Sequence, residues 1–183
     1  MVVPVPTYIK RIIHLDNLPI YLQRGGIHAW NHTPKDGHSY KIIHNVDIQS
    51  KRHRVPVPCG PCGVIHDYVP FYFGHLSPML LQLKTGQVSG YTEGQEPIIH
   101  LVSSAQLVQS SGIDFVFTDG HGIVQYTDWF DDLACLQHVD WKMINERYWA
   151  KSSGDTDRQR RKQAEFLVHR FLPWDLLIEI VVI

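Results

Sequence analysis

Short segments rich in Val, Ile, Tyr and Phe recur along this chain, and the helical patterns between them do not alternate with them in a regular strand–helix–strand order. This irregular order favours an α+β fold with a largely antiparallel sheet over a doubly wound parallel sheet, which requires regular alternation. We therefore predict strands at 8–13, 64–73, 97–102, 114–118, 164–169 and 178–183.

Several short helices are expected between these strands. Asp16 is the predicted N-cap of a helix that ends before Gly25. Ser77 can cap a helical turn over 79–83, whereas 40–54 shows only loose helical spacing and stays ambiguous. Further helices are predicted at 103–111, 126–137 and 140–150.

Composition limits the class of protein. With 183 residues, 44% of them hydrophobic and 19% charged, the chain is long enough for one domain with an ordinary core. A formal net charge of −1 excludes a protein that coats DNA through bulk charge, although a local basic patch is still compatible. No apolar run could span a bilayer, the N-terminus lacks a secretion signal, and there are three cysteines, so we expect a cytoplasmic protein without membrane contact.

Two of the cysteines form a Cys-Gly-Pro-Cys motif at 59–62 that is similar to a thioredoxin redox motif. A reactive motif needs a helix N-terminus at its first cysteine, but here a strand-like run follows. A zinc site needs four ligands; Cys135 and His66 could contribute, yet there is no second such motif. We therefore expect a loop with two free thiols and no metal, with redox or zinc chemistry as the lesser alternatives.

Glu165 lies in a segment whose side chains alternate. Phe166 and Val168 share one face of the predicted strand, so Glu165 shares the opposite face with Leu167. A carboxylate beside an apolar side chain has two interpretations. It either leans into solvent at the strand end, or it is a buried group that acts as a base or holds a hydroxyl.

Basic and aromatic residues cluster locally. The runs 51–54 and 158–162 are either solvated surface or clamps for phosphate groups. The aromatic run 68–73 belongs either to the core or to the wall of a pocket that stacks a nicotinamide or a base. Twelve histidines fit a site for planar, polar ligands, while the glycine-rich motifs that cradle dinucleotides and nucleoside triphosphates are absent from the sequence.

Several segments, in one order over nearly the whole chain, match a known family. They are HLDNL at 14–18, HDYVPFYF at 66–73, SPML at 77–80, GQEPI at 94–98, FVFTDGHG at 115–122 and AEFLV at 164–168. Together these segments closely resemble the DarT family of bacterial toxins. Such proteins transfer ADP-ribose from NAD+ to thymidine bases in single-stranded DNA, and a macrodomain antitoxin, DarG, removes the mark.

The resemblance implies an ADP-ribosyltransferase fold, with a split, mostly antiparallel β core, surrounding helices, and NAD+ in the cleft. It implies a single ADP-ribosyltransferase domain over 1–183. Family members continue past the last strand predicted here, and the sequence ends within the apolar segment 180–183, so we expect a C-terminally truncated chain. The implied partners are NAD+, single-stranded DNA and a DarG-like antitoxin.

The resemblance also assigns site residues. Glu165 matches the catalytic glutamate, which positions the ribose and assists charge development as nicotinamide leaves. Arg52 looks like the catalytic arginine that helps to activate the thymine, either as a perturbed base or as an electrostatic stabiliser, and its register against Arg54 stays open. The family usually has His at Arg11 and Thr at Ile13. The implied NAD+ contacts are Arg11, Ile13, His14, Asn17, His28, Arg52 and Tyr72. The implied DNA contacts are Arg54, His121, Tyr148 and Trp149.

Two further functions remain open at this stage. The first is an ADP-ribosyltransferase that modifies RNA, guanine or protein, which would share the cleft and Glu165. The second is a module that binds single-stranded nucleic acid without catalysis, and Glu165 together with Arg52 argues against it. The aromatic run 68–73 makes us favour thymidine in DNA as the target.

Overall fold

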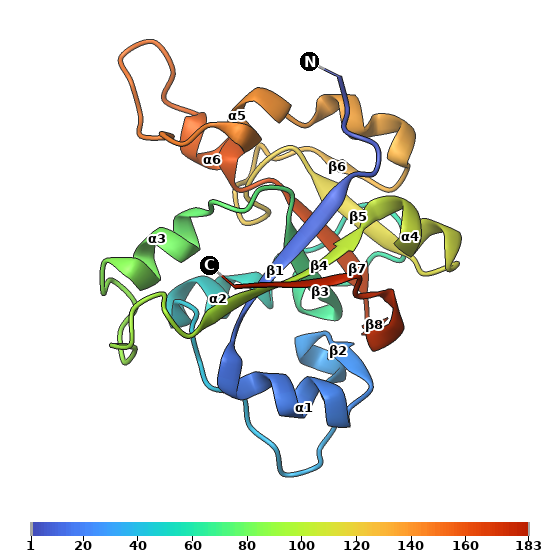
Figure 1. Cartoon of the computed structure of the whole chain (residues 1–183). Coiled ribbons are helices and arrows are strands. Elements are labelled where there is room, and N and C mark those ends of the chain that lie inside the picture. Colours follow the sequence, from blue (N-terminus) through green and yellow to red (C-terminus); the bar gives the residue numbers. More distant parts are fainter. Residues whose placement is uncertain (1, 183) are drawn as a thin grey trace.

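The computed structural model describes residues 2–182, and within them nine strands and six short α-helices form an α+β fold (Figure 1). The strands are β1 (Tyr8–His14), β2 (Gly26–His28), β3 (Tyr68–Tyr72), β4 (Ile98–Ser104), β5 (Phe115–Thr118), β6 (Trp129–Phe130), β7 (Glu165–His169), β8 (Phe171–Pro173) and β9 (Glu179–Val182). The helices are α1 (Leu18–Gln23), α2 (Val46–Arg52), α3 (Pro78–Lys84), α4 (Ala105–Ser110), α5 (Trp141–Asn145) and α6 (Arg158–Lys162).

Seven of these strands form one sheet in the order β6–β5–β7–β3–β1–β4–β9, and each neighbouring pair is antiparallel. Strands β2 and β8 form a separate antiparallel pair. The predicted antiparallel α+β architecture is therefore confirmed. The predicted last strand is present over Glu179–Val182, while residue 183 lies outside the described part of the chain.

The sheet is split between β1 and β3. These two strands pair at one position, Lys10 opposite Tyr72, whereas β1 pairs with β4 continuously from Tyr8–Ser104 to His14–Ile98. Away from the Lys10–Tyr72 pair, β1 and β3 no longer pair as neighbouring strands. Side chains from both strands are therefore free to line the space between them.

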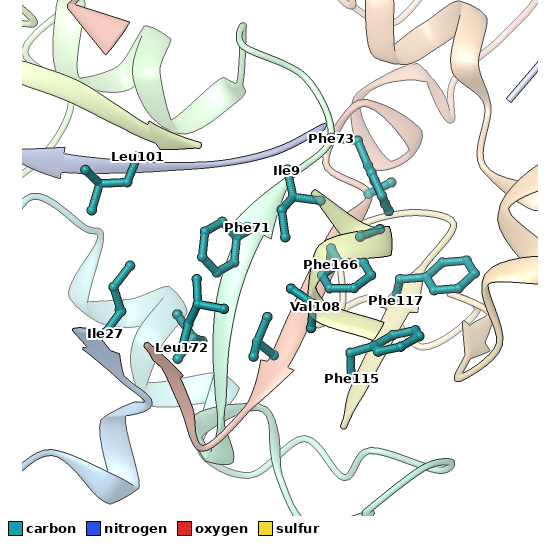
Figure 2. Close-up of a cluster of buried hydrophobic side chains, with 14 of the residues drawn as sticks. Ile9, Ile27, Phe71, Phe73, Leu101, Val108, Phe115, Phe117, Phe166 and Leu172 are labelled. Atoms are coloured by element: carbon teal, nitrogen blue, oxygen red, sulfur yellow. The ribbon is translucent and has the colours of Figure 1, made fainter. Parts of the chain in front are cut away.

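A hydrophobic core holds the two parts of the sheet together (Figure 2). Ile9 of β1, Phe71 of β3 and Phe166 of β7 are fully buried within it, and Phe115 stacks on Phe166 with ring centroids 4.9 Å apart. Burying a side chain of this size contributes about 1.5–3 kcal/mol. Leu167 belongs to a second cluster on the opposite face, which confirms the predicted alternation and places Glu165 on that second face.

Local sequence signals explain most helix boundaries. Ser77 caps α3 by accepting a hydrogen bond from the amide of Leu80, as predicted. Asn45 caps α2 in the same way, which settles the ambiguous segment 40–54 as a loop followed by a helix. The predicted cap at Asp16 is wrong, because His14 Nδ1 accepts the Asp16 amide hydrogen bond and begins a 3₁₀ turn instead.

Two predicted helices and one predicted strand are shorter or different in the structure. The segment 126–137 contains β6 and a 3₁₀ helix, because Phe130 pairs with β5 and stacks on Phe117 at 5.2 Å. Helix α5 stops at Asn145, where Lys162 Nζ caps its end by donating to the carbonyls of Ile144 and Glu146. The strand predicted from residue 64 begins only at β3, after a 3₁₀ turn.

Candidate active site

A cavity of about 680 Å³ opens where β1 and β3 diverge, and its size is in the usual range for a ligand pocket. Strands β1, β2, β3 and β7, helix α2 and the loop after β5 all contribute side chains to its wall. The sheet split therefore becomes a binding space that segments far apart in the sequence share.

Arg52 and Glu165 meet at this cavity although 113 residues separate them. Arg52 is the last residue of α2 and Glu165 the first of β7, and both are almost fully buried. The guanidinium binds the carboxylate with both arms, Nη1 to Oε1 at 2.9 Å and Nη2 to Oε2 at 2.7 Å. This fork fixes both groups at the cavity, whereas Arg54 lies outside the cavity wall.

The pair keeps both groups ionised. Burial by itself would raise the pKa of Glu165, but the charge of Arg52 and hydrogen bonds outweigh it and hold that pKa well below its usual range. Burial would lower the pKa of Arg52, and the neighbouring carboxylate reverses this, so its pKa is raised. Tyr72, opposite Glu165 across β3 and β7, has its pKa raised by burial and by the carboxylate, so it stays a neutral phenol.

The loop from Asp119 to Asp128 reaches Glu165 from the other side. The Gly122 amide donates to Glu165 Oε1 at 3.4 Å, and His121 Nδ1 lies 3.3 Å from the same oxygen. His121 Nδ1 is buried and makes no hydrogen bond with any residue from 2 to 182. The imidazole therefore packs its Nδ1 against the Glu165 carboxylate, while His121 also lines the cavity.

Arg160 holds this loop in place. Its guanidinium binds Asp119 through two bonds of 2.8 and 2.9 Å and Asp157 through two of 2.8 Å. A Cβ on Gly120 would lie 2.3 Å from Arg160 Nη1, so no larger residue fits there. Thr118 Oγ1 accepts from the Glu165 amide and donates to the Gly120 carbonyl, which ties the loop to β7.

Six of the seven residues predicted to contact NAD+ line the cavity. Arg11 donates from Nη1 to the Pro70 carbonyl, while its buried Nε has no hydrogen-bond partner among the described residues. His14 is not in the cavity wall, because its Nδ1 accepts from Asp16 and its Nε2 lies 3.2 Å from Glu93. The six cavity residues are Arg11, Ile13, Asn17, His28, Arg52 and Tyr72.

The residues predicted to contact DNA are divided. His121 lines the cavity, and Arg54 is exposed close by, after the C-terminal end of α2. Tyr148 and Trp149 do not line it; they lie in the loop between α5 and α6 that projects at the edge of the molecule (Figure 1). Trp149 packs under Lys162 Nζ at 5.1 Å, which is a structural contact.

Among the cavity residues that the sequence did not assign to NAD+ or DNA are Trp30, His44, Gln49 and His66. They come from the turn after β2, the loop before α2, α2 itself and the turn before β3. No spacing rule joins such distant positions. The histidine content was the usable signal, since five of the twelve histidines line the cavity.

The Cys-Gly-Pro-Cys loop lies outside the cavity wall and does not favour thiol chemistry. Burial raises the pKa of Cys59 to about 11, whereas a redox motif needs a lowered pKa. All three cysteines are free, and among residues 2–182 no group of three His, Cys, Asp or Glu side chains is arranged to hold a metal ion.

An antiparallel sheet that opens around a cavity, with a buried glutamate at the start of a central strand, is the architecture of an ADP-ribosyltransferase, and this defines the class of the chain. The sequence profile of DarT, described as an ssDNA thymidine ADP-ribosyltransferase, matches residues 10–183. The chain belongs to the DarT family.

Individual relatives agree with this assignment. A DNA ADP-ribosyl transferase from Thermus aquaticus is 48% identical over 180 residues, which cover 98% of this chain and 77% of that protein. The structure of Thermus sp. 2.9 DarT in complex with ADP-ribosylated ssDNA superimposes with a TM-score of 0.92 at 44% identity, covering 100% of this chain and 84% of its own. The complex of the same protein with NAD+ gives a TM-score of 0.86 at 43% identity, covering 99% and 84%. The similarity therefore extends over the whole cavity wall described above.

Proposed function

We propose that this protein transfers ADP-ribose from NAD+ to thymidine bases in single-stranded DNA and releases nicotinamide. The observation that carries the proposal is the buried Arg52–Glu165 pair on the wall of a ligand-sized cavity, in a chain of the DarT family. Structures of the similar Thermus sp. 2.9 protein contain NAD+ and ADP-ribosylated ssDNA. These are the donor and the product that the proposed reaction would have.

Glu165 assists the first bond change. The bond between ribose C1′ and the nicotinamide nitrogen breaks, the electron pair leaves with nicotinamide, and positive charge develops on the sugar. A carboxylate that is ionised and rigidly held stabilises this charge and can accept a hydrogen bond from a ribose hydroxyl. Arg52 keeps Glu165 in that state by holding its pKa low.

Arg52 acts on the thymine. A thymine ring nitrogen is a poor nucleophile while protonated, so its proton passes to water as the nitrogen forms the new bond to C1′, and negative charge develops on the base during this step. Because the pKa of Arg52 is raised by Glu165, we assign the guanidinium to electrostatic stabilisation of this charge and not to proton removal.

The residues that line the cavity support the proposed NAD+ contacts. Arg11 has a buried, unpaired Nε and can bind the diphosphate, which replaces the glycine-rich loop of other nucleotide sites. Asn17 bonds to both the amide and the carbonyl of Lys41, so it positions the rim of the cavity as well. We assign His28 and Tyr72 to planar contacts with the cofactor.

The protein is proposed to act in the cytoplasm, with a DarG-like macrodomain antitoxin as its partner. Three free cysteines fit a reducing compartment. No helix among residues 2–182 is long and apolar enough to cross a membrane. We also infer one ADP-ribosyltransferase domain, because β1 and β9, from the two ends of the chain, both pair with β4.

Mass spectrometry of short oligonucleotides tests the function. The protein is incubated with NAD+ and paired single strands that differ only in whether thymine is present. A gain of one ADP-ribose on the thymine-containing strands, absent with Glu165→Gln, is the expected result. A gain on strands without thymine, or only on RNA or protein, would overturn the proposal.

A further inference from the structure

Trp30 is an exposed aromatic side chain in the wall of the cavity, with 58% of its surface accessible. It starts a 3₁₀ turn directly after β2, and the preceding Ala29 is buried in the core and bonded through its amide to the Arg170 carbonyl. The backbone below the indole is therefore fixed while the ring itself remains open to solvent.

Two histidine rings support the indole. His66 lies 5.5 Å away between ring centroids with a tilt of 32°, and His44 meets it edge-on at 5.8 Å. His66 Nε2 contacts Gln49 Oε1 at 3.0 Å, which fixes the imidazole plane. Burial lowers the pKa of His66 to about 4, and the charge of Arg52 adds to this, so the ring is neutral at physiological pH.

Asp67 ties the two turns together. Its Oδ1 accepts from Asn31 Nδ2 at 2.9 Å and lies 3.5 Å from His32 Nε2, while its Oδ2 accepts from the Val64 amide at 2.9 Å. These contacts therefore join the turn that contains Trp30 to the turn that contains His66. We call Trp30 with His66 the aromatic platform.

Two cationic side chains lie beyond the platform, outside the cavity wall. His53 lies 6.1 Å from His66 between ring centroids, next to exposed Lys51 and Arg54. Neither Lys51 nor Arg54 forms an ion pair with a residue from 2 to 182. Both side chains lie outside the cavity wall, so an anion that binds them must extend beyond the cavity. A nucleic-acid strand extends in this way, whereas a dinucleotide enclosed in the cavity does not.

We propose that the aromatic platform stacks a nucleobase neighbouring the target thymine in single-stranded DNA, with the adjoining phosphates on Lys51 and Arg54. Stacking on an aromatic ring beside unpaired cations is how single strands are held without base-pairing readout. This subsite rests on the proposed function, since it places the DNA strand relative to the Arg52–Glu165 pair.

Steady-state kinetics of Trp30→Ala and Trp30→Phe test the platform. With a thymine-containing oligonucleotide, Trp30→Ala should raise the KM for DNA about tenfold, as expected for one lost base stack, while the KM for NAD+ stays unchanged. Trp30→Phe should recover most of this loss. Tyr8→Ala, at a partly exposed aromatic residue outside the cavity wall, is the matched control. A raised KM for NAD+ with an unchanged KM for DNA would assign Trp30 to the dinucleotide and overturn the proposal.

A direct measurement of DNA binding distinguishes a failure of the platform from a failure of the proposed function. Fluorescence anisotropy with a labelled single strand measures binding and does not require transfer of ADP-ribose. It can therefore be used even if the wild-type protein modifies no oligonucleotide, a result that would contradict the proposed function but not the platform. Trp30→Ala should weaken binding about tenfold, and Lys51→Gln and Arg54→Gln should each lower the slope of log K against log salt by about 0.7. Unchanged binding of Trp30→Ala, or a larger loss with Tyr148→Ala, would overturn the platform.

Discussion

Arg52 and Arg160 both bind carboxylates with two arms of the guanidinium, but their surroundings differ. Arg52 has one partner, Glu165, and both are buried at the cavity. Arg160 has two partners, Asp119 and Asp157, and both of these remain partly accessible. The comparison teaches that the same type of bond can serve two purposes. Two carboxylates hold Arg160 in place under the loop, whereas Arg52 faces only Glu165, the group proposed to assist nicotinamide release.

Because the Arg52–Glu165 pair is buried, it is sensitive to substitution of either residue. Removing one partner of a buried ion pair leaves an uncompensated charge and costs about 3–5 kcal/mol, whereas removing one carboxylate from Arg160 leaves another in place. We therefore expect changes at the first arginine to affect chemistry strongly and changes at the second to affect mainly the position of the loop.

The largest effect is expected for Glu165→Gln. Loss of the carboxylate removes stabilisation of the developing sugar charge, so the rate of ADP-ribose transfer should fall by at least about 10²–10³-fold. Initial rates by mass spectrometry measure this, with thermal melting to confirm folding. Glu179→Gln, at an exposed position on β9, is the control and should keep the wild-type rate. Transfer within tenfold of wild type in Glu165→Gln would contradict the catalytic assignment.

Arg52→Lys should come next, because lysine keeps the charge but loses the fork. We expect transfer to thymine to fall about 10²-fold, and NAD+ hydrolysis without DNA to fall less, since Glu165 still assists nicotinamide release. Arg54→Lys is the matched variant and should lower transfer by less than tenfold. If Arg54→Lys had the greater effect, the catalytic register would belong to Arg54.

Asp119→Asn should have a moderate effect. It weakens the brace on the loop that carries His121, so kcat should fall about tenfold, while stability should change by only about 1 kcal/mol because Asp157 still holds Arg160. Asp155→Asn, which removes one of the carboxylates bound to Arg161, should cost similar stability without lowering kcat. Equal losses of kcat in both variants would show that the brace has no specific role.

The smallest effect is a pH dependence of stability. Because the pKa of Glu165 is lowered on folding, its contribution is fully present above its ordinary value of 4.5 and is lost as pH falls below it. The difference in Tm between wild type and Glu165→Gln should therefore stay constant above about pH 5 and shrink as the pH falls from about 5 towards 3. A difference that stays constant over this range would mean that the carboxylate is not held ionised by Arg52.

The strands were largely predictable, and the errors have physical causes. Alternation at Glu165 was reliable because β7 is buried on both faces, so period two placed the carboxylate with Leu167. The helix predicted at 126–137 failed because pairing of β6 with β5 outweighed local helical preference. The cap at Asp16 failed because His14 competed for the same amide.

The site was predictable only in part. The resemblance pointed to Arg52 and Glu165, and the structure places Arg52 in the cavity wall and Arg54 outside it, because α2 ends at Arg52 and Arg54 lies in the turn that follows. Trp30 and His66 come from turns 36 positions apart, and their contact depends on Asp67 joining those turns. No periodicity in the sequence encodes such a contact, so it could be found only in the folded structure.

The close packing of Gly120 against Arg160 limits how the loop from Asp119 to Asp128 could be redesigned. Any side chain at this position meets the guanidinium, and a Cβ on Gly122 would lie 3.2 Å from Ile65 Cδ1, so the two glycines leave little room for variation. Val124 and Gln125, which are partly or fully exposed, are the positions where a library could change the loop surface. Redesign of this loop should therefore start after Gly122 and leave the first half of the loop intact.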